Sequence, residues 1–195
     1  MSDTPPQQSE GSDGPSEFVN NLIEHVRAHN LTGEYTIQDN KDFGPSLVAT
    51  RDFSIGDVVV RERAMYMTTA DLLGSWRDAG SPCRSVIARL FKVDADSAEC
   101  DLEIGKNAKL DTSTELVDPD HSSLRGWVAG FALNGYSLSG SDKTGLFVIA
   151  SKVAHSCSPN VATITDPDTD TLMFTAVKPI RAGELVFSSY LAGNK

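Results

Sequence analysis

Cysteine is scarce in this sequence, and the few that occur are far apart. The chain of 195 residues contains three cysteines, Cys83, Cys100 and Cys157, and no CxxC pair. An odd and dispersed set does not suit a disulfide framework, which favours a reducing compartment. The N-terminus lacks a basic-then-apolar signal pattern, and no apolar run reaches membrane-spanning length. We therefore expect an intracellular protein, of the nucleus, the cytoplasm or both, without a membrane partner.

Positive charge is also in short supply. The chain has 17 Lys and Arg residues against 27 Asp and Glu residues, which gives a net charge of −10. A surface that binds nucleic acid needs clustered Lys and Arg, so we expect no direct nucleic-acid partner. The acidity suits a basic partner such as a Lys-rich tail, although it also simply favours solubility.

The composition differs between the N-terminal end and the rest of the chain. Residues 1–16 contain mostly Ser, Pro, Gly, Gln and acidic residues and cannot bury an apolar face, so we expect a disordered tail there. Residues 17–195 are long enough for one domain with a sizeable core. Helical patterns occupy much of residues 69–133, beginning with Thr69 as a capping residue.

Strand patterns lie on both sides of this helical part. The segments are rich in β-branched residues, partly alternate between apolar and polar side chains, and are bounded by turn residues. The segment 145–154, by contrast, is apolar enough to be buried. The composition of the segments predicts a β-rich α+β domain. The predicted strands are residues 47–50, 58–67, 161–165, 171–177 and 184–190.

The stretch VAHSCSPNV, residues 153–161, concentrates polar chemistry inside an apolar region. His155 and Cys157 would supply two zinc ligands, whereas a structural site needs four, so we expect no metal site. A Cys–His nucleophile needs a third orienting group and usually forms between residues distant in sequence. Phosphate-binding loops are absent, since Leu146 stands where a Walker motif requires Lys. The remaining interpretation of the stretch is a turn with a special backbone shape.

The same stretch resembles the NHSCxPN signature of SET-domain protein lysine methyltransferases. Three other blocks agree with that family in order: GPSLVATRDFSIGDVVVRERA, NGYSLSGSDKTGLFVIASKV and KPIRAGELVFSSY. The resemblance covers roughly residues 42–190 and is closest to the SET and MYND subfamily, although the chain has no MYND zinc finger.

This resemblance implies a fold, a reaction and partners. The fold would be the SET-domain fold, with small β-sheets around a threaded pseudoknot core and a helical insertion at about residues 69–133. The reaction would be N-methylation of protein lysine with S-adenosylmethionine as cofactor. The partner would be a protein with an accessible lysine, a basic tail such as that of a histone being one candidate.

The resemblance also assigns roles to individual residues. Ala154 and His155 would hold the adenine end of the cofactor, and Gly44, Pro45 and Ser46 would lie along its methionine end. Two further residues match the family motifs. Asn134 would contact the cofactor, and Tyr190 would be the catalytic residue whose hydroxyl orients the reacting groups.

The sequence departs from the family pattern in several places. Ala154 stands in place of Asn, and Gly44-Pro45-Ser46 stands in place of Gly-x-Gly. No cysteines follow Tyr190 to join Cys157 around zinc. These departures leave three explanations open: a compact SET protein, a fragment, or a degenerate copy. The alternative function is a catalytically silent SET module that binds protein partners.

Overall fold

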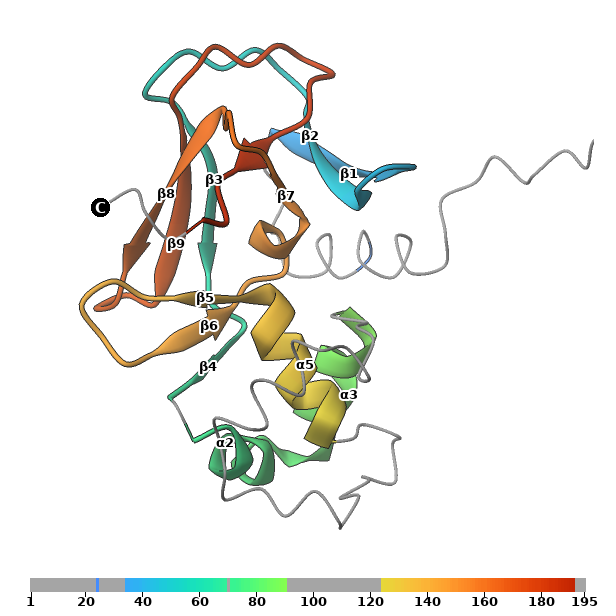
Figure 1. The fold of residues 1–195 in the computed structure, drawn as a ribbon, viewed down its shortest axis with the longest axis vertical. Helices are drawn as coiled ribbons and strands as arrows, with labels where there is room; N and C mark the ends of the chain where they lie inside the picture. Colours follow the sequence, from blue (N-terminus) through green and yellow to red (C-terminus); the bar gives the residue numbers. More distant parts are fainter. Residues whose placement is uncertain (1–23, 25–33, 70, 91–123, 192–195) are drawn as a thin grey trace, which may run out of the picture.

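The computed structural model describes residue 24 and residues 34–69, 71–90 and 124–191 (Figure 1). The predicted N-terminal tail, residues 91–123 of the predicted insertion and with them Cys100 lie outside these residues. In the described part of the chain, no helix is both long and apolar enough to cross a membrane.

Small sheets surround the core. The described strands form a β1–β2 hairpin, a sheet of order β3-β9-β8, a sheet of order β4-β6-β5, and a short parallel pair of β7 with β10. The parallel pair apart, all neighbouring strands are antiparallel. The bounds are β1 (Tyr35–Asn40), β2 (Gly44–Ala49), β3 (Val58–Arg63), β4 (Tyr66–Thr68), β5 (Gly135–Ser137), β6 (Thr144–Leu146), β7 (Ala154–His155), β8 (Val161–Asp166), β9 (Thr171–Ala176) and β10 (Phe187–Ser188).

Local side-chain chemistry closes the first hairpin. The Asn40 carboxamide oxygen accepts hydrogen bonds from the backbone N–H groups of Asp42, at 2.9 Å, and Phe43, at 3.3 Å. Gly44 then takes a φ of 68°, which a glycine adopts without a steric cost. The result is a tight turn that places the start of β2 beside Phe43.

Three helices of the described chain, α2 (Leu72–Asp78), α3 (Gly80–Leu90) and α5 (Leu124–Asn134), lie together on one side of the sheets (Figure 1). The predicted cap at Thr69 is wrong, because Asp71 caps α2 by accepting the Gly74 N–H at 2.8 Å. Backbone N–H groups in the first turn of a helix have no acceptor within the helix, and the Asp71 carboxylate supplies one.

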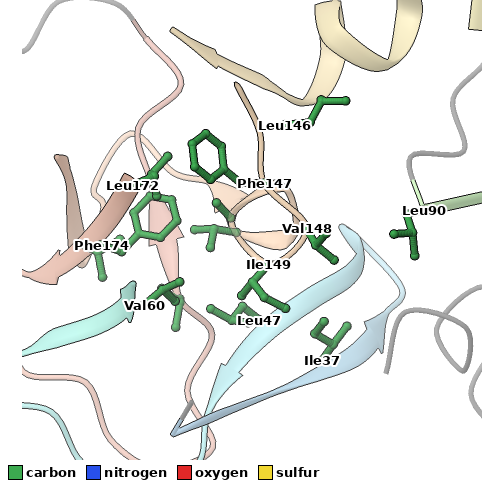
Figure 2. Packing of buried hydrophobic residues seen from close by; sticks show 14 of the residues in the cluster. Ile37, Leu47, Val60, Leu90, Leu146, Phe147, Val148, Ile149, Leu172 and Phe174 are labelled. Atoms are coloured by element: carbon green, nitrogen blue, oxygen red, sulfur yellow. The ribbon is translucent and has the colours of Figure 1, made fainter. Parts of the chain in front are cut away.

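The core lies between the β3-β9-β8 sheet, the first hairpin and the segment after β6. The side chains of Phe147, Val148 and Ile149 from this segment are at most 1% exposed, as predicted for the apolar run (Figure 2). They pack among residues of several strands, including Leu47 and Phe174. Burial of such side chains stabilises a fold by about 1.5–3 kcal/mol each, so this segment is firmly placed.

Two strand predictions need correction, and one strand was not predicted. The predicted strand at residues 58–67 is two strands of different sheets, because the chain leaves β9 at Ala64 and turns toward Leu146 at Met65. Only residues 187 and 188 of the predicted final strand are paired as a strand. Strand β1 was not predicted, since Ile37 is its single buried residue.

The C-terminal segment and the AHSCSPN stretch are interlaced. β7 and β10 run parallel, so the chain between them must cross over through β8 and β9 before returning. The Asn160 side chain joins the two segments, donating to the Leu185 carbonyl and accepting from the Phe187 N–H, both at 2.8 Å. This threaded arrangement sets the geometry of the site.

Candidate functional site

A cavity of about 370 Å³ lies where the helical part, the β4-β6-β5 sheet and the C-terminal segment meet. Asn134, the last residue of α5, and Tyr190, beyond β10, line it together. Ser151 and Thr163 contribute hydroxyl groups to its wall, and Tyr136 from β5 contributes an aromatic ring. None of the described residues that line this cavity is charged.

Tyr190 is fixed at both its backbone and its side chain. Its hydroxyl donates to the carbonyl oxygen of Val153 at 2.6 Å, and its backbone N–H donates to Nδ1 of His155 at 3.0 Å. Burial of the hydroxyl raises the pKa of Tyr190, so the group keeps its proton at neutral pH. The tyrosine therefore presents the lone pairs of a neutral oxygen to the cavity.

His155 connects this tyrosine to the signature stretch. Because Nδ1 accepts the Tyr190 N–H, the proton of the neutral ring belongs on Nε2, which lies 3.6 Å from Sγ of Cys157. The His155 and Tyr190 rings are 5.3 Å apart. Within the described chain, no three His, Cys, Asp or Glu side chains gather as metal ligands.

Asn134 is well placed to meet a ligand. Its amide nitrogen donates to the Gly130 carbonyl at 3.2 Å, and its amide oxygen accepts no hydrogen bond from the described residues. The chain turns sharply at the next residue, since a Cβ on Gly135 would lie 2.4 Å from the Phe131 carbonyl oxygen. Asn134 therefore lines the cavity at the end of α5, with its amide nitrogen bonded to the helix.

Tyr136 is a residue of this cavity that the sequence analysis missed. Its hydroxyl donates to the Ala150 carbonyl at 2.9 Å, and its ring packs edge-on against Phe147 and Phe174. Burial, together with the neighbouring Tyr190 and Glu62, raises the pKa of the Tyr136 hydroxyl. In the sequence, Tyr136 could have been found from its position two residues after Asn134, a predicted cofactor contact.

The Gly44-Pro45-Ser46 segment does not line this cavity. Gly44 has open space where a Cβ would stand, which leaves its backbone accessible. Ser46 is 1% exposed, and its hydroxyl donates to the Gly44 carbonyl at 3.0 Å, so the side chain turns inward. The segment approaches β10 through the Phe43 and Phe187 rings, whose centroids are 5.6 Å apart.

Ala154 and His155 lie between these two regions. They form β7, where Ala154 is paired with Phe187 and His155 with Ser188. The structure thus brings Asn134 and Tyr190 into one cavity and joins Ala154 and His155 to its edge through Tyr190. It leaves the glycine segment outside the cavity, next to the Phe43 ring that contacts Phe187 of β10.

Two of these residues would offer a contact to a cofactor such as S-adenosylmethionine, but from separate regions of the structure. The Asn134 amide oxygen, which accepts no hydrogen bond from the described residues, would receive a donor in the cavity, whereas the open backbone at Gly44 lies outside the cavity. Ala154 supplies no side-chain amide, which removes one polar contact from the set.

Comparison with known proteins gives a family and a fold. A family model described as the SET domain matches residues 44–191. Among solved structures, the SET domain of LSMT bound to lysine and AdoHcy aligns with a TM-score of 0.58 and 16% identity over 91% of this chain and 54% of that chain. Rubisco LSMT bound to AdoMet aligns with a TM-score of 0.57 and 14% identity over 92% of this chain and 54% of that chain.

This chain therefore spans about half the length of these two solved structures. No curated protein matches its sequence. The structural likeness establishes the predicted fold, β-rich with a group of helices.

Proposed function

The chain belongs to the SET-domain family, and from that membership we propose that it is an S-adenosylmethionine-dependent protein-lysine N-methyltransferase. The observation that carries the proposal is the uncharged cavity in which Asn134 meets Tyr190. The fold likeness to structures bound to lysine and to AdoMet supports it. We also propose that the chain is closest to the SET and MYND subfamily, because its sequence blocks resemble those of that subfamily.

Methyl transfer to lysine makes two demands on a protein. S-adenosylmethionine, when bound, supplies the methyl group; a nitrogen–carbon bond forms as the carbon–sulfur bond breaks. The amine must arrive without its proton, and it must lie in line with the methyl group. A cavity without charged side chains disfavours an ammonium ion, because burial penalises the charged form. The lining described above has this character.

Tyr190 is the group we assign to the alignment of the amine. Its hydroxyl hydrogen is committed to the Val153 carbonyl, so its oxygen is left as an acceptor for an N–H of the incoming amine. The backbone link to His155 holds this oxygen in a fixed position relative to β7. Orientation of this kind supplies much of the rate in a reaction without a covalent intermediate.

The remaining sequence-predicted residues belong to cofactor binding in this proposal. Asn134 would accept a hydrogen bond at its amide oxygen, and Ala154 and His155 would hold the adenine end through the β7 backbone. Gly44, Pro45 and Ser46 would lie along the methionine end, although in this structure they stand apart from the cavity. The substrate would be a protein with an accessible lysine, and the net charge of −10 favours a basic segment.

A combined binding and transfer experiment tests this function. The purified 195-residue chain is titrated with S-adenosylmethionine by calorimetry, and then incubated with a Lys-rich histone-tail peptide and with the same peptide carrying Arg at every Lys. We expect saturable binding and a methyl mass increase on the Lys peptide alone. Absence of both binding and transfer would favour the silent, partner-binding module instead.

A further inference from the structure

One buried carboxylate has no role in the site described so far. Glu62 of β3 is 3% exposed, in the core rather than at the surface. Its two oxygens accept hydrogen bonds from three consecutive backbone N–H groups, those of Val148 at 2.6 Å, Ile149 at 3.0 Å and Ala150 at 3.0 Å. A buried carboxylate is costly without such partners, and the three N–H groups would otherwise be unsatisfied.

These N–H groups begin a single compact turn. The segment at residues 148–153 contains the 3-10 helix η1 (Ala150–Lys152), closed by hydrogen bonds from Lys152 N–H to the Ile149 carbonyl at 2.9 Å and from Val153 N–H to the Ala150 carbonyl at 3.1 Å. The side chains of Val148 and Ile149 anchor the segment in the core (Figure 2). Glu62 therefore holds one end of a short, internally bonded unit.

The other side of this unit holds the two tyrosines of the cavity. The Ala150 carbonyl accepts from the Tyr136 hydroxyl at 2.9 Å, and the Val153 carbonyl accepts from the Tyr190 hydroxyl at 2.6 Å. A shift of the turn would move both carbonyls, and each hydroxyl would follow or lose its acceptor. Glu62 is thus connected to both hydroxyl groups through one segment of backbone.

We propose that Glu62 is a positioning residue for methyl transfer, which fixes the 148–153 turn and through it the hydroxyl oxygens of Tyr136 and Tyr190. This inference rests on the proposed function, since only a reacting amine gives those oxygens a catalytic purpose. The role differs from plain core stability, because it acts through two named carbonyl groups that accept from the hydroxyls of Tyr136 and Tyr190.

Charged and titratable groups surround Glu62 on several elements. Lys152 of η1 is buried beside it and attracts it, whereas Tyr35 of β1 and Tyr136 of β5 face it as weaker neighbours. Burial outweighs the three backbone hydrogen bonds and raises the pKa of Glu62 to about 7. Desolvation therefore favours the neutral form of Glu62, whereas the hydrogen bonds from the turn favour its charged form.

The test compares Glu62→Gln with core variants of equal stability. Gln keeps the size of Glu but presents an N–H₂ group where two oxygens faced N–H donors, so the turn loses acceptors. Ile180 is 1% exposed, and its backbone exchanges hydrogen bonds with Phe53 instead of with the turn. Ile180→Val and Ile180→Ala therefore bracket the loss of stability, and a melting curve selects the matched control.

Two measurements are made on the full-length proteins. The first is the ring ¹³C resonances of Tyr136 and Tyr190, assigned with the two Tyr→Phe variants. The second is the separation of kcat from KM for S-adenosylmethionine in methyl transfer to the Lys-rich histone-tail peptide. We expect both ring resonances to move in Glu62→Gln, kcat to fall about tenfold or more, and KM to change less than about threefold. The matched Ile180 variant should leave the resonances and kcat close to wild type.

Each outcome decides the proposal. Unmoved tyrosine resonances in Glu62→Gln, or a kcat no lower than that of the matched Ile180 variant, would overturn it. If wild type itself transfers no methyl group, the proposed function fails, while the resonances still show whether Glu62 positions the tyrosines. Should Glu62→Gln not fold, Glu62→Asp takes its place, because its shorter side chain keeps the charge but cannot reach all three N–H groups.

Discussion

Tyr190 donates its backbone N–H to Nδ1 of His155 across 3.0 Å, and the two rings stand 5.3 Å apart. One residue of this pair belongs to the signature stretch and the other to the C-terminal segment. The contact fixes the tautomer of the histidine and the position of the tyrosine at once. Changes at either segment should therefore separate cofactor binding from turnover.

Tyr190→Phe should lower methyl transfer by about 10²-fold while leaving folding and cofactor affinity nearly unchanged. The substitution removes the hydroxyl that donates to the Val153 carbonyl, and with it the oxygen offered to the amine. Single-turnover rates and calorimetric titration with S-adenosylmethionine separate the two effects. Tyr66→Phe is a matched control, since its hydroxyl donates to the Ser75 carbonyl within α2. An equal loss of cofactor affinity in Tyr190→Phe would contradict the assignment.

Ala154→Asn should tighten S-adenosylmethionine binding about tenfold, which corresponds to about 1.4 kcal/mol from a regained side-chain hydrogen bond. The residue lies in β7 beside Phe187, next to His155. The same change at exposed Ala182, in a turn bonded to Asp52, should leave the affinity alone. Calorimetric dissociation constants of wild type and the two variants measure the change in affinity. No change in Ala154→Asn would mean that β7 does not face the adenine end.

The sequence predicted much of this fold because several signals were local. The apolar run after β6 is buried, the hairpin of β8 and β9 forms between its two predicted strands, and the AHSCSPN stretch lies against the C-terminal segment. Asn134 and Tyr190, taken from separate motifs, meet in one cavity. The roles of the site residues stay predictions.

Other features depended on contacts distant in sequence. Alternation along β3 puts Glu62 on the same side as Val60, between exposed Arg61 and Arg63, so an acid on a core face was visible in the pattern. Its partners begin 86 residues later, at Val148, and no local rule names them. The split at Ala64 is hidden for the same reason, because propensity describes a strand but not the sheet that it joins.

Asn160→Ala should lower the free energy of unfolding by about 2–3 kcal/mol, since it removes two hydrogen bonds between the threaded segments. The Leu185 carbonyl and the Phe187 N–H would both lose their partner. Asn160→Asp is the matched variant: a carboxylate still accepts from Phe187 but cannot donate to Leu185, so we expect a smaller loss. Urea denaturation at pH 7 measures both. Equal stability of Asn160→Ala and wild type would show that the side chain does not hold the segments together.

The buried pair of Glu62 and Lys152 should give stability a characteristic pH dependence. Burial raises the pKa of Glu62 from 4.5 to about 7, so between these values the folded state binds more protons than the unfolded state. The free energy of unfolding should therefore fall as pH rises through this window. Burial also lowers the pKa of Lys152 from 10.5 to about 8, and there the unfolded state binds more protons, so stability should rise again from pH 8 to 10.5.

Glu62→Gln isolates the acidic half of this profile. The variant has no carboxyl to titrate, so the difference in unfolding free energy between wild type and Glu62→Gln should shrink from pH 4.5 to pH 7. Glu184→Gln is the control, because that exposed carboxylate accepts from the Arg181 N–H at the surface. Denaturant midpoints at closely spaced pH values measure the difference. A wild-type advantage that grows from pH 4.5 to 7 would mean that the three backbone N–H groups and Lys152 outweigh burial, with the Glu62 pKa depressed instead of raised.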